Sequence, residues 1–224
     1  MSEQNEKIIA GLHRKNLTNI KFASALLDMA IEEKKDDLNF ALQQAKEVQQ
    51  IAAKESRKKN SIEFATLYWK ATLMLAPYFF EDFLYYMEKD RAPDKRFYMP
   101  RRRTLKVVVD DLQDLEDGKL DFYGLSMPPR VGKSTICIFF MAWIMGKRPN
   151  SHNAMSGHSG ILAGGFYGEA LNLMELDVPE EKRQYHFLDI FPQTFLQKKS
   201  AENREVTLND PDRFATLTCR GIEG

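Results

Sequence analysis

The sequence predicts an α/β protein with a largely parallel sheet, preceded by an N-terminal helical region. A short apolar segment at 122–127 leads through a glycine-containing loop into the apolar run 136–145, and a second strand-like segment at 152–156 leads into a helical pattern from 159 to about 174. This strand–helix–strand–helix order is typical of a sheet whose strands run parallel. The polar, helical pattern of residues 1–60 lies outside this unit and predicts a separate region.

The bulk composition is that of an ordinary globular protein. Of the 224 residues, 43% are hydrophobic and 29% are charged, and 32 basic residues balance 32 acidic ones. Net charge therefore argues neither for nor against a nucleic-acid partner. Two cysteines do not make a disulfide scaffold, and we see neither an apolar leader nor a run long enough to span a bilayer. The composition predicts a cytoplasmic protein without a membrane partner.

The helical region, residues 1–60, has no catalytic pattern. Apolar residues recur at steps of three and four along 38–52, and earlier ones, including Ile8, Ile9 and Leu12, predict one or two further helices. We interpret the region as a helical hairpin for packing or partner contact. A DNA-reading helix-turn-helix is the alternative, although no glycine marks its turn.

Residues 61–96 predict an aromatic-rich helical segment that leads into the third region, 97–224. Ser61 is the expected N-cap of a first helix, and Pro77 separates this helix from a second one. The aromatic residues recur at helical spacing, which favours packing in a core, whereas stacking against nucleic-acid bases is the alternative.

A basic stretch joins these two regions. Between residues 90 and 106, seven positive residues stand against two negative ones, and Pro93 and Pro100 predict that much of the stretch is loop. It is expected to contact nucleotide or DNA phosphates, with a solvated charged surface as the alternative. Asp110 and Asp111 then end an apolar run that resembles a metal-binding strand, but their helical spacing favours a helix.

The C-terminal third predicts further strands. Residues 205–208 and 214–219 have strand-like patterns around the turn 209–212. His152, His158, Cys137 and Cys219 do not have the spacing of metal ligands.

The strongest functional signal is the segment 127–134, MPPRVGKS. It matches the phosphate-binding pattern G-x-x-x-x-G-K-[ST], except that Met127 holds the first glycine position. The loop enters a helix N-terminus, where N–H groups and the positive end of the helix dipole attract an anion. Gly146 is expected to end this helix in the left-handed conformation, and Pro149 to prevent its resumption. The pattern predicts a P-loop NTPase-type three-layer fold.

The loop predicts a site for ATP and Mg²⁺. Its expected nucleotide-binding residues are Pro129, Arg130, Val131, Gly132, Lys133, Ser134 and Thr135. Lys133 is expected to reach the β- and γ-phosphates, Ser134 to place its hydroxyl on Mg²⁺, and Arg130 to donate two hydrogen bonds to the γ-phosphate. Lys133 and Arg130 are therefore the predicted catalytic residues.

Together these segments resemble the large terminase subunit of tailed bacteriophages, the ATP-driven motor that packs DNA into proheads. The segments that carry the resemblance are the loop 127–134, the strand and helix at 154–163, and two landmarks at 187–192 and 220–224. The resemblance covers roughly 97–224. Basic segments like 97–103 approach the adenine in similar proteins, which adds Arg101 and Arg102 to the expected nucleotide-binding residues.

For the complete protein, the resemblance implies ATP hydrolysis that powers packaging. The implied partners are double-stranded viral DNA, a small terminase subunit and a portal protein, in a homo-oligomeric motor in the cytoplasm of the bacterial host. Family members continue past 220–224 to an acidic metal-binding strand and a nuclease domain, so we expect a truncated ATPase domain with little activity. The alternatives are another loop-bearing enzyme, such as a helicase-like ATPase or a nucleotide kinase, and a non-catalytic interaction module.

Overall fold

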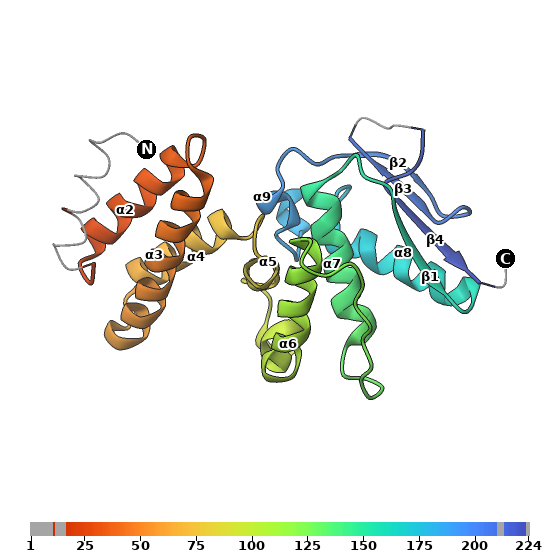
Figure 1. Ribbon diagram of the computed structural model, residues 1–224, viewed down its shortest axis with the longest axis horizontal. Coiled ribbons are helices and arrows are strands. Elements are labelled where there is room, and N and C mark those ends of the chain that lie inside the picture. The colour runs from red at the N-terminus through yellow and green to blue at the C-terminus, as the bar shows by residue number, and fades with distance from the viewer. Residues whose placement is uncertain (1–10, 12–16, 210–212, 223–224) are drawn as a thin grey trace. The chain divides into compact units, whose positions relative to one another are not determined.

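The computed structural model describes residues 11, 17–209 and 213–222 (Figure 1). The chain divides into two compact units, Met1–Tyr78 and Phe79–Gly224, so the division lies within the predicted segment 61–96. The expected helix around Ile8, Ile9 and Leu12, and most of the expected turn 209–212, lie outside the described residues.

The first unit contains three described helices, α2 (Ile20–Glu33), α3 (Leu38–Lys59) and α4 (Ile62–Leu75), and α3 packs against both of the others. The predicted apolar stripe is confirmed, since Ala41, Ala45 and Val48 are fully buried along α3. Ser61 caps α4 as predicted, because its side chain accepts a hydrogen bond from the N–H of Phe64.

The second unit contains most of the predicted α/β region. Its helices are α5 (Phe80–Met87), α6 (Tyr98–Glu116), α7 (Lys133–Lys147), α8 (Gly160–Met174) and α9 (Phe187–Ile190), with short 3₁₀ turns η1 (Pro93–Lys95) and η2 (Glu180–Lys182). The expected helix from 159 is confirmed as α8, and the Ser159 side chain caps it through the N–H of Leu162. The expected helix through Asp110 and Asp111 is confirmed as part of α6.

A small mixed sheet lies in this unit. Its strands are β1 (Asn153–Gly157), β2 (Leu196–Ser200), β3 (Glu205–Leu208) and β4 (Leu217–Gly221), in the order β1-β4-β3-β2. Only β1 and β4 run parallel, and the other two pairs are antiparallel. Val206, Leu208, Leu217 and Cys219 are buried on one face, and α8 packs beside the strands (Figure 1).

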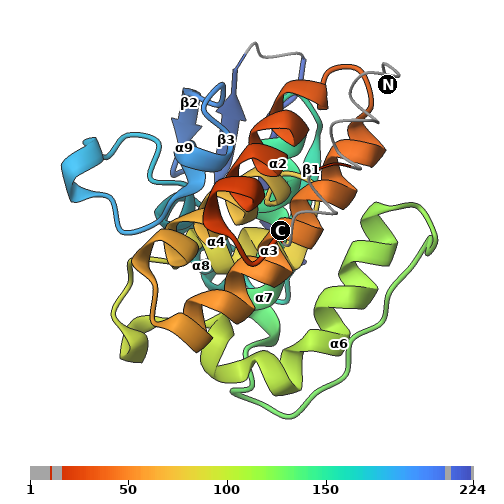
Figure 2. The same ribbon diagram turned by 90° about the vertical axis from the view of Figure 1, so that its left-hand side faces the viewer.

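The predicted fold class is wrong. The described chain is mostly helical, and its four-stranded sheet is mixed, so it is not a three-layer P-loop NTPase-type fold with a mostly parallel sheet. The predicted strand at 122–127 does not form, and Figure 2 shows an irregular segment between α6 and α7. The segment pairs with none of the four strands, and although Phe122 is 83% exposed, Tyr123, Leu125 and Met127 are partly buried. Helix α7 packs mainly against α8 and α5.

The expectation that much of 90–106 is loop holds only for its first half, and the expectation for Gly146 is wrong. Residues 90–97 lie outside α-helices, but the arginines at 101–103 lie on α6, because Pro100 is only the third residue of the helix, where a backbone N–H has no intrahelical acceptor. Gly146 lies inside α7 and does not have a positive φ. A Cβ at Gly146 would lie 2.7 Å from Cγ of Phe191, so close packing explains this glycine.

Candidate nucleotide-binding site

The segment 127–134 forms a loop that ends at the N-terminus of α7. Gly132 is the N-cap residue, with φ 103° and ψ 19°, a conformation that favours glycine. Arg130 also has a positive φ of 66°, which is uncommon for a residue with a side chain. No side chain among the described residues caps α7, so its first-turn N–H groups face the loop without a capping acceptor. Free N–H groups at a helix N-terminus attract anions in general.

Lys133 closes the loop on itself. Its ammonium group donates to the carbonyl oxygen of Met127 and, at 3.2 Å, to that of Pro128. The first half of the loop therefore supplies carbonyl acceptors, for which proline is as good as any residue. These bonds hold the Lys133 ammonium group over the loop. A phosphate in the loop would have to replace the two carbonyl oxygens as its hydrogen-bond acceptor.

The N-terminus of α6 lies against this loop. A Cβ at Gly132 would lie 2.6 Å from Cε2 of Phe97 and 3.8 Å from Cδ of Arg101. Arg101 donates to the carbonyl oxygen of Phe97 at 3.0 Å, and its guanidinium carbon lies 5.4 Å from the centre of the Phe97 ring. The structure thus brings together Arg101 and Gly132, two of the predicted nucleotide-binding residues that lie far apart in the sequence.

Arg102 is directed to a different partner. Its Nε donates to Glu81 on α5 at 2.9 Å, and the Tyr98 hydroxyl donates to the same oxygen at 2.7 Å. Burial and the neighbouring Glu81 carboxylate raise the pKa of Tyr98. Arg102 therefore serves the α5–α6 contact, and no interaction of the described residues joins it to the loop.

The other predicted residues line the loop with different exposure. Pro129, Arg130 and Ser134 are exposed, whereas Val131 and Thr135 are partly buried. Arg130 combines an exposed side chain with a positive φ and lies two residues before the N-cap of α7.

Two residues that sequence reasoning missed position this site. Phe97 stacks on Phe139 of α7, with ring centres 5.5 Å apart. The carboxylate of Glu88, which is 2% exposed, accepts hydrogen bonds from the N–H groups of Phe97 and Tyr98 at 2.8 to 3.0 Å. Glu88 thereby caps α6 from nine and ten residues away, a spacing that no short capping pattern covers.

Ser134 is the one predicted metal-contacting residue. Its exposed hydroxyl at the start of α7 is compatible with Mg²⁺, which keeps several waters and phosphate oxygens among its ligands. No group of three or more acidic, histidine or cysteine residues with metal-binding geometry occurs within 11, 17–209 and 213–222. Asp110 is engaged by Lys106 at 2.6 Å, and Asp111 accepts a hydrogen bond from Tyr123.

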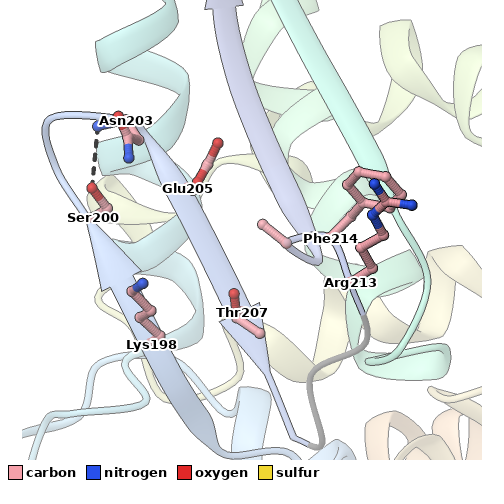
Figure 3. A pocket seen from close by; sticks show the side chains of 8 residues that line it. Lys198, Ser200, Asn203, Glu205, Thr207, Arg213 and Phe214 are labelled. Carbon is pink, nitrogen blue, oxygen red and sulfur yellow. Dashed lines mark hydrogen bonds between the residues drawn. The ribbon is translucent and has the colours of Figure 1, made fainter.

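A hollow of about 270 Å³ lies on the sheet, away from the loop (Figure 3). Its lining mixes charges, since Lys198 and Arg213 accompany Glu205. The phenyl ring of Phe214 lies beside Arg213, whose guanidinium carbon is 5.4 Å from the ring centre (Figure 3). Glu205 is paired with Arg220 at 2.8 Å. The Ser200 hydroxyl accepts a hydrogen bond from the N–H of Asn203, which fixes the β2–β3 turn. This arrangement has no catalytic pattern.

Comparisons with known proteins do not identify a family. No family model matches the chain, and neither the curated proteins nor the solved structures include a match. Within the described part of the chain, none of the helices combines the length and the apolar character needed to cross a bilayer.

Proposed function

We propose that the loop 127–135 binds the phosphates of ATP with Mg²⁺, and that the chain belongs to a motor of the terminase large-subunit type. The observation that carries the proposal is the N-terminus of α7, which begins after Gly132 without a side-chain cap. Lys133 lies there with its ammonium group bonded to the loop carbonyl of Met127. The sequence motif, the conformation of Gly132 and the free helix N-terminus all favour the same kind of ligand, a polyphosphate.

The roles of the residues follow from their positions. The N–H groups from Val131 to Thr135 bind phosphate oxygens, and Gly132 keeps the backbone free of a side chain at the closest approach. Lys133 exchanges its carbonyl partners for the β- and γ-phosphates, and Arg130 contacts the γ-phosphate. Arg101, whose Cδ would lie 3.8 Å from a Cβ at Gly132, would contact the nucleoside end of the ligand.

In a motor of this type, hydrolysis at this loop would drive double-stranded viral DNA into a prohead, with a small terminase subunit and a portal protein as partners. Bound Mg²⁺ would supply positive charge that offsets the negative charge developing during phosphoryl transfer. Ser134 would share in holding it.

The test is the affinity for ATP, measured by calorimetry in the presence of Mg²⁺. Lys133→Gln should weaken binding at least tenfold, which corresponds to about 1.4 kcal/mol. Lys198→Gln removes an equal charge from the exposed strand β2 and serves as the control. Equal affinities of the Lys133 variant and the parent, with both folded by circular dichroism, would exclude the loop as the binding site.

A further inference from the structure

A second basic site lies in the same unit, where the turn after α5 meets the segment before α9. It is a hollow of about 320 Å³, and the residues of its lining that carry the argument are Asp90, Arg91, Lys95, Arg183 and His186. Three of these five are permanent cations. Arg91 and Lys95 belong to the basic stretch 90–106, for which a phosphate contact was expected, whereas Arg183 and His186 were in no predicted site.

Hydrogen bonds to backbone groups fix the walls of this hollow. Arg96 donates from Nε to the carbonyl oxygen of Arg91 and from Nη2 to that of Lys89, both at 2.8 Å. On the other side, the Glu175 carboxylate accepts from the N–H groups of Gln184 and Tyr185, both at 2.8 Å. Because the chain is held on both sides, the cations are presented by a preorganised frame.

Some N–H donors of these basic side chains have no hydrogen-bond acceptor or carboxylate partner among the described residues. The Arg91 guanidinium lies over the Tyr185 ring, 4.2 Å from its centre, and its Nε is buried without a hydrogen-bond partner in the described chain. Arg183 donates from Nε to the carbonyl oxygen of Val178 at 2.9 Å. No carboxylate of the described residues pairs with Lys95 or Arg183 within 4.0 Å.

The acidic groups nearby have partners of their own. Asp90 lies 3.0 Å from Nε2 of His186, whose Nδ1 lies 2.8 Å from Asp189. Glu88 is occupied by the backbone of α6 and lies 3.7 Å from Nη1 of Arg91. The Glu175 carboxylate interacts electrostatically with Arg183 and Arg91, while its hydrogen bonds go to the backbone. Among the described residues no carboxylate lies within ion-pair distance of Lys95 or Arg183, so these two side chains keep donors that suit an anionic oxygen.

We propose that this hollow binds a backbone phosphate of nucleic acid. Arg91 and Arg183 would donate to the phosphate oxygens, and the exposed Lys95 would add charge at the rim. An open, solvated hollow binds a single small anion weakly, whereas a polymer brings several phosphates to the same surface at once. The DNA partner rests on the proposed function, but the site itself does not depend on the phosphate loop.

The experiment measures binding of a 30-base-pair duplex by fluorescence anisotropy between about 50 and 200 mM salt. The double variant Lys95→Ala/Arg183→Ala should weaken binding at least tenfold at low salt and reduce the slope of log K against log salt by about two, one for each lost phosphate contact. Affinity for ATP should not change. The control, Lys58→Ala/Lys198→Ala, loses the same charge at two exposed positions outside the hollow.

Three outcomes overturn the assignment. An equal loss in the control pair would mean that only net charge matters, and absence of duplex binding by the parent would remove the nucleic-acid ligand. Binding of inorganic phosphate that disappears in the hollow variant, with duplex binding unchanged, would assign the hollow to a free anion. The Lys133→Gln variant separates the two proposals. If it loses ATP binding but keeps duplex binding, the loop and the hollow act independently, and a negative result at the hollow leaves the proposal for the loop standing.

Discussion

Gly132→Ala tests the close contact between the loop and α6. Alanine at φ 103° incurs the strain of a left-handed residue, about 1–2 kcal/mol. Its Cβ would also lie 2.6 Å from Cε2 and 3.0 Å from Cζ of Phe97, so the ring must move off Phe139, a stack that contributes about 0.5–1.5 kcal/mol. The two terms together predict a loss of about 1.5–3.5 kcal/mol in the free energy of unfolding, together with at least tenfold weaker ATP binding.

The assay is urea unfolding followed by tryptophan fluorescence, with ATP affinity measured on the same samples. Gly118→Ala is the matched control, because Gly118 has a φ of 72° but no atom within 4 Å of the added Cβ. It should show the backbone strain alone. The variant Gly132→Ala/Phe97→Leu should recover part of the difference, since leucine removes the ring. Equal destabilisation by Gly132→Ala and Gly118→Ala would refute the predicted contact.

Two further predictions concern helix packing and ionisation. Gly146→Ala should destabilise the protein by about 1–3 kcal/mol, because the added Cβ would overlap Phe191. Gly168→Ala, whose Cβ would have nothing within 4 Å, should instead stabilise α8 by about 0.5–1 kcal/mol. Thermal or urea unfolding measures both, and equal effects would contradict the packing of Gly146 against Phe191. Burial, followed by the hydrogen bond to Asp111, raises the pKa of Tyr123 to about 12. The folded chain thus keeps a proton that the unfolded chain releases near pH 10, so this contribution to stability falls between about pH 10 and 12. The difference between the ultraviolet titrations of the parent and of Tyr123→Phe should correspond to one tyrosine that ionises above about pH 10. In Asp111→Asn this tyrosine should ionise at a lower pH. An unchanged titration in Asp111→Asn would remove Asp111 as a cause of the raised pKa.

Local signals in the sequence predicted the elements that local chemistry determines. Ser61 and Ser159 cap α4 and α8 through N–H groups three residues away, a range that a sequence pattern covers. Strands depend on partners instead. The segment 122–127 has a suitable apolar pattern but finds no neighbouring strand, whereas β2, with Lys198 and Lys199 at its centre, is held by pairing with β3 despite a polar sequence.

The candidate site shows the same division. The loop and its helix were predicted from the order G-K-S before an apolar run, whereas the left-handed conformation of Gly132 at the N-cap was not predicted. The contact of Phe97 with Gly132 joins residues 35 positions apart, and Glu88 reaches the start of α6 from α5's C-terminal end. Neither spacing belongs to a local motif, so only the packing of α5, α6 and α7 reveals them.

Glu88 also limits which substitutions separate the two proposed anion sites. Its buried carboxylate holds the N–H of Phe97, which contacts the phosphate loop, and it lies 3.7 Å from Arg91 of the basic hollow. A substitution of Glu88 would leave α6 uncapped and alter the surroundings of Arg91, so a loss of ATP or DNA binding would follow from either cause. Lys95 and Arg183 avoid this problem, because no hydrogen bond or ion pair of the described residues joins their side chains to Glu88 or Phe97. For the same reason Lys133, whose ammonium group contacts only the loop carbonyls among the described residues, is the cleaner probe of the nucleotide site.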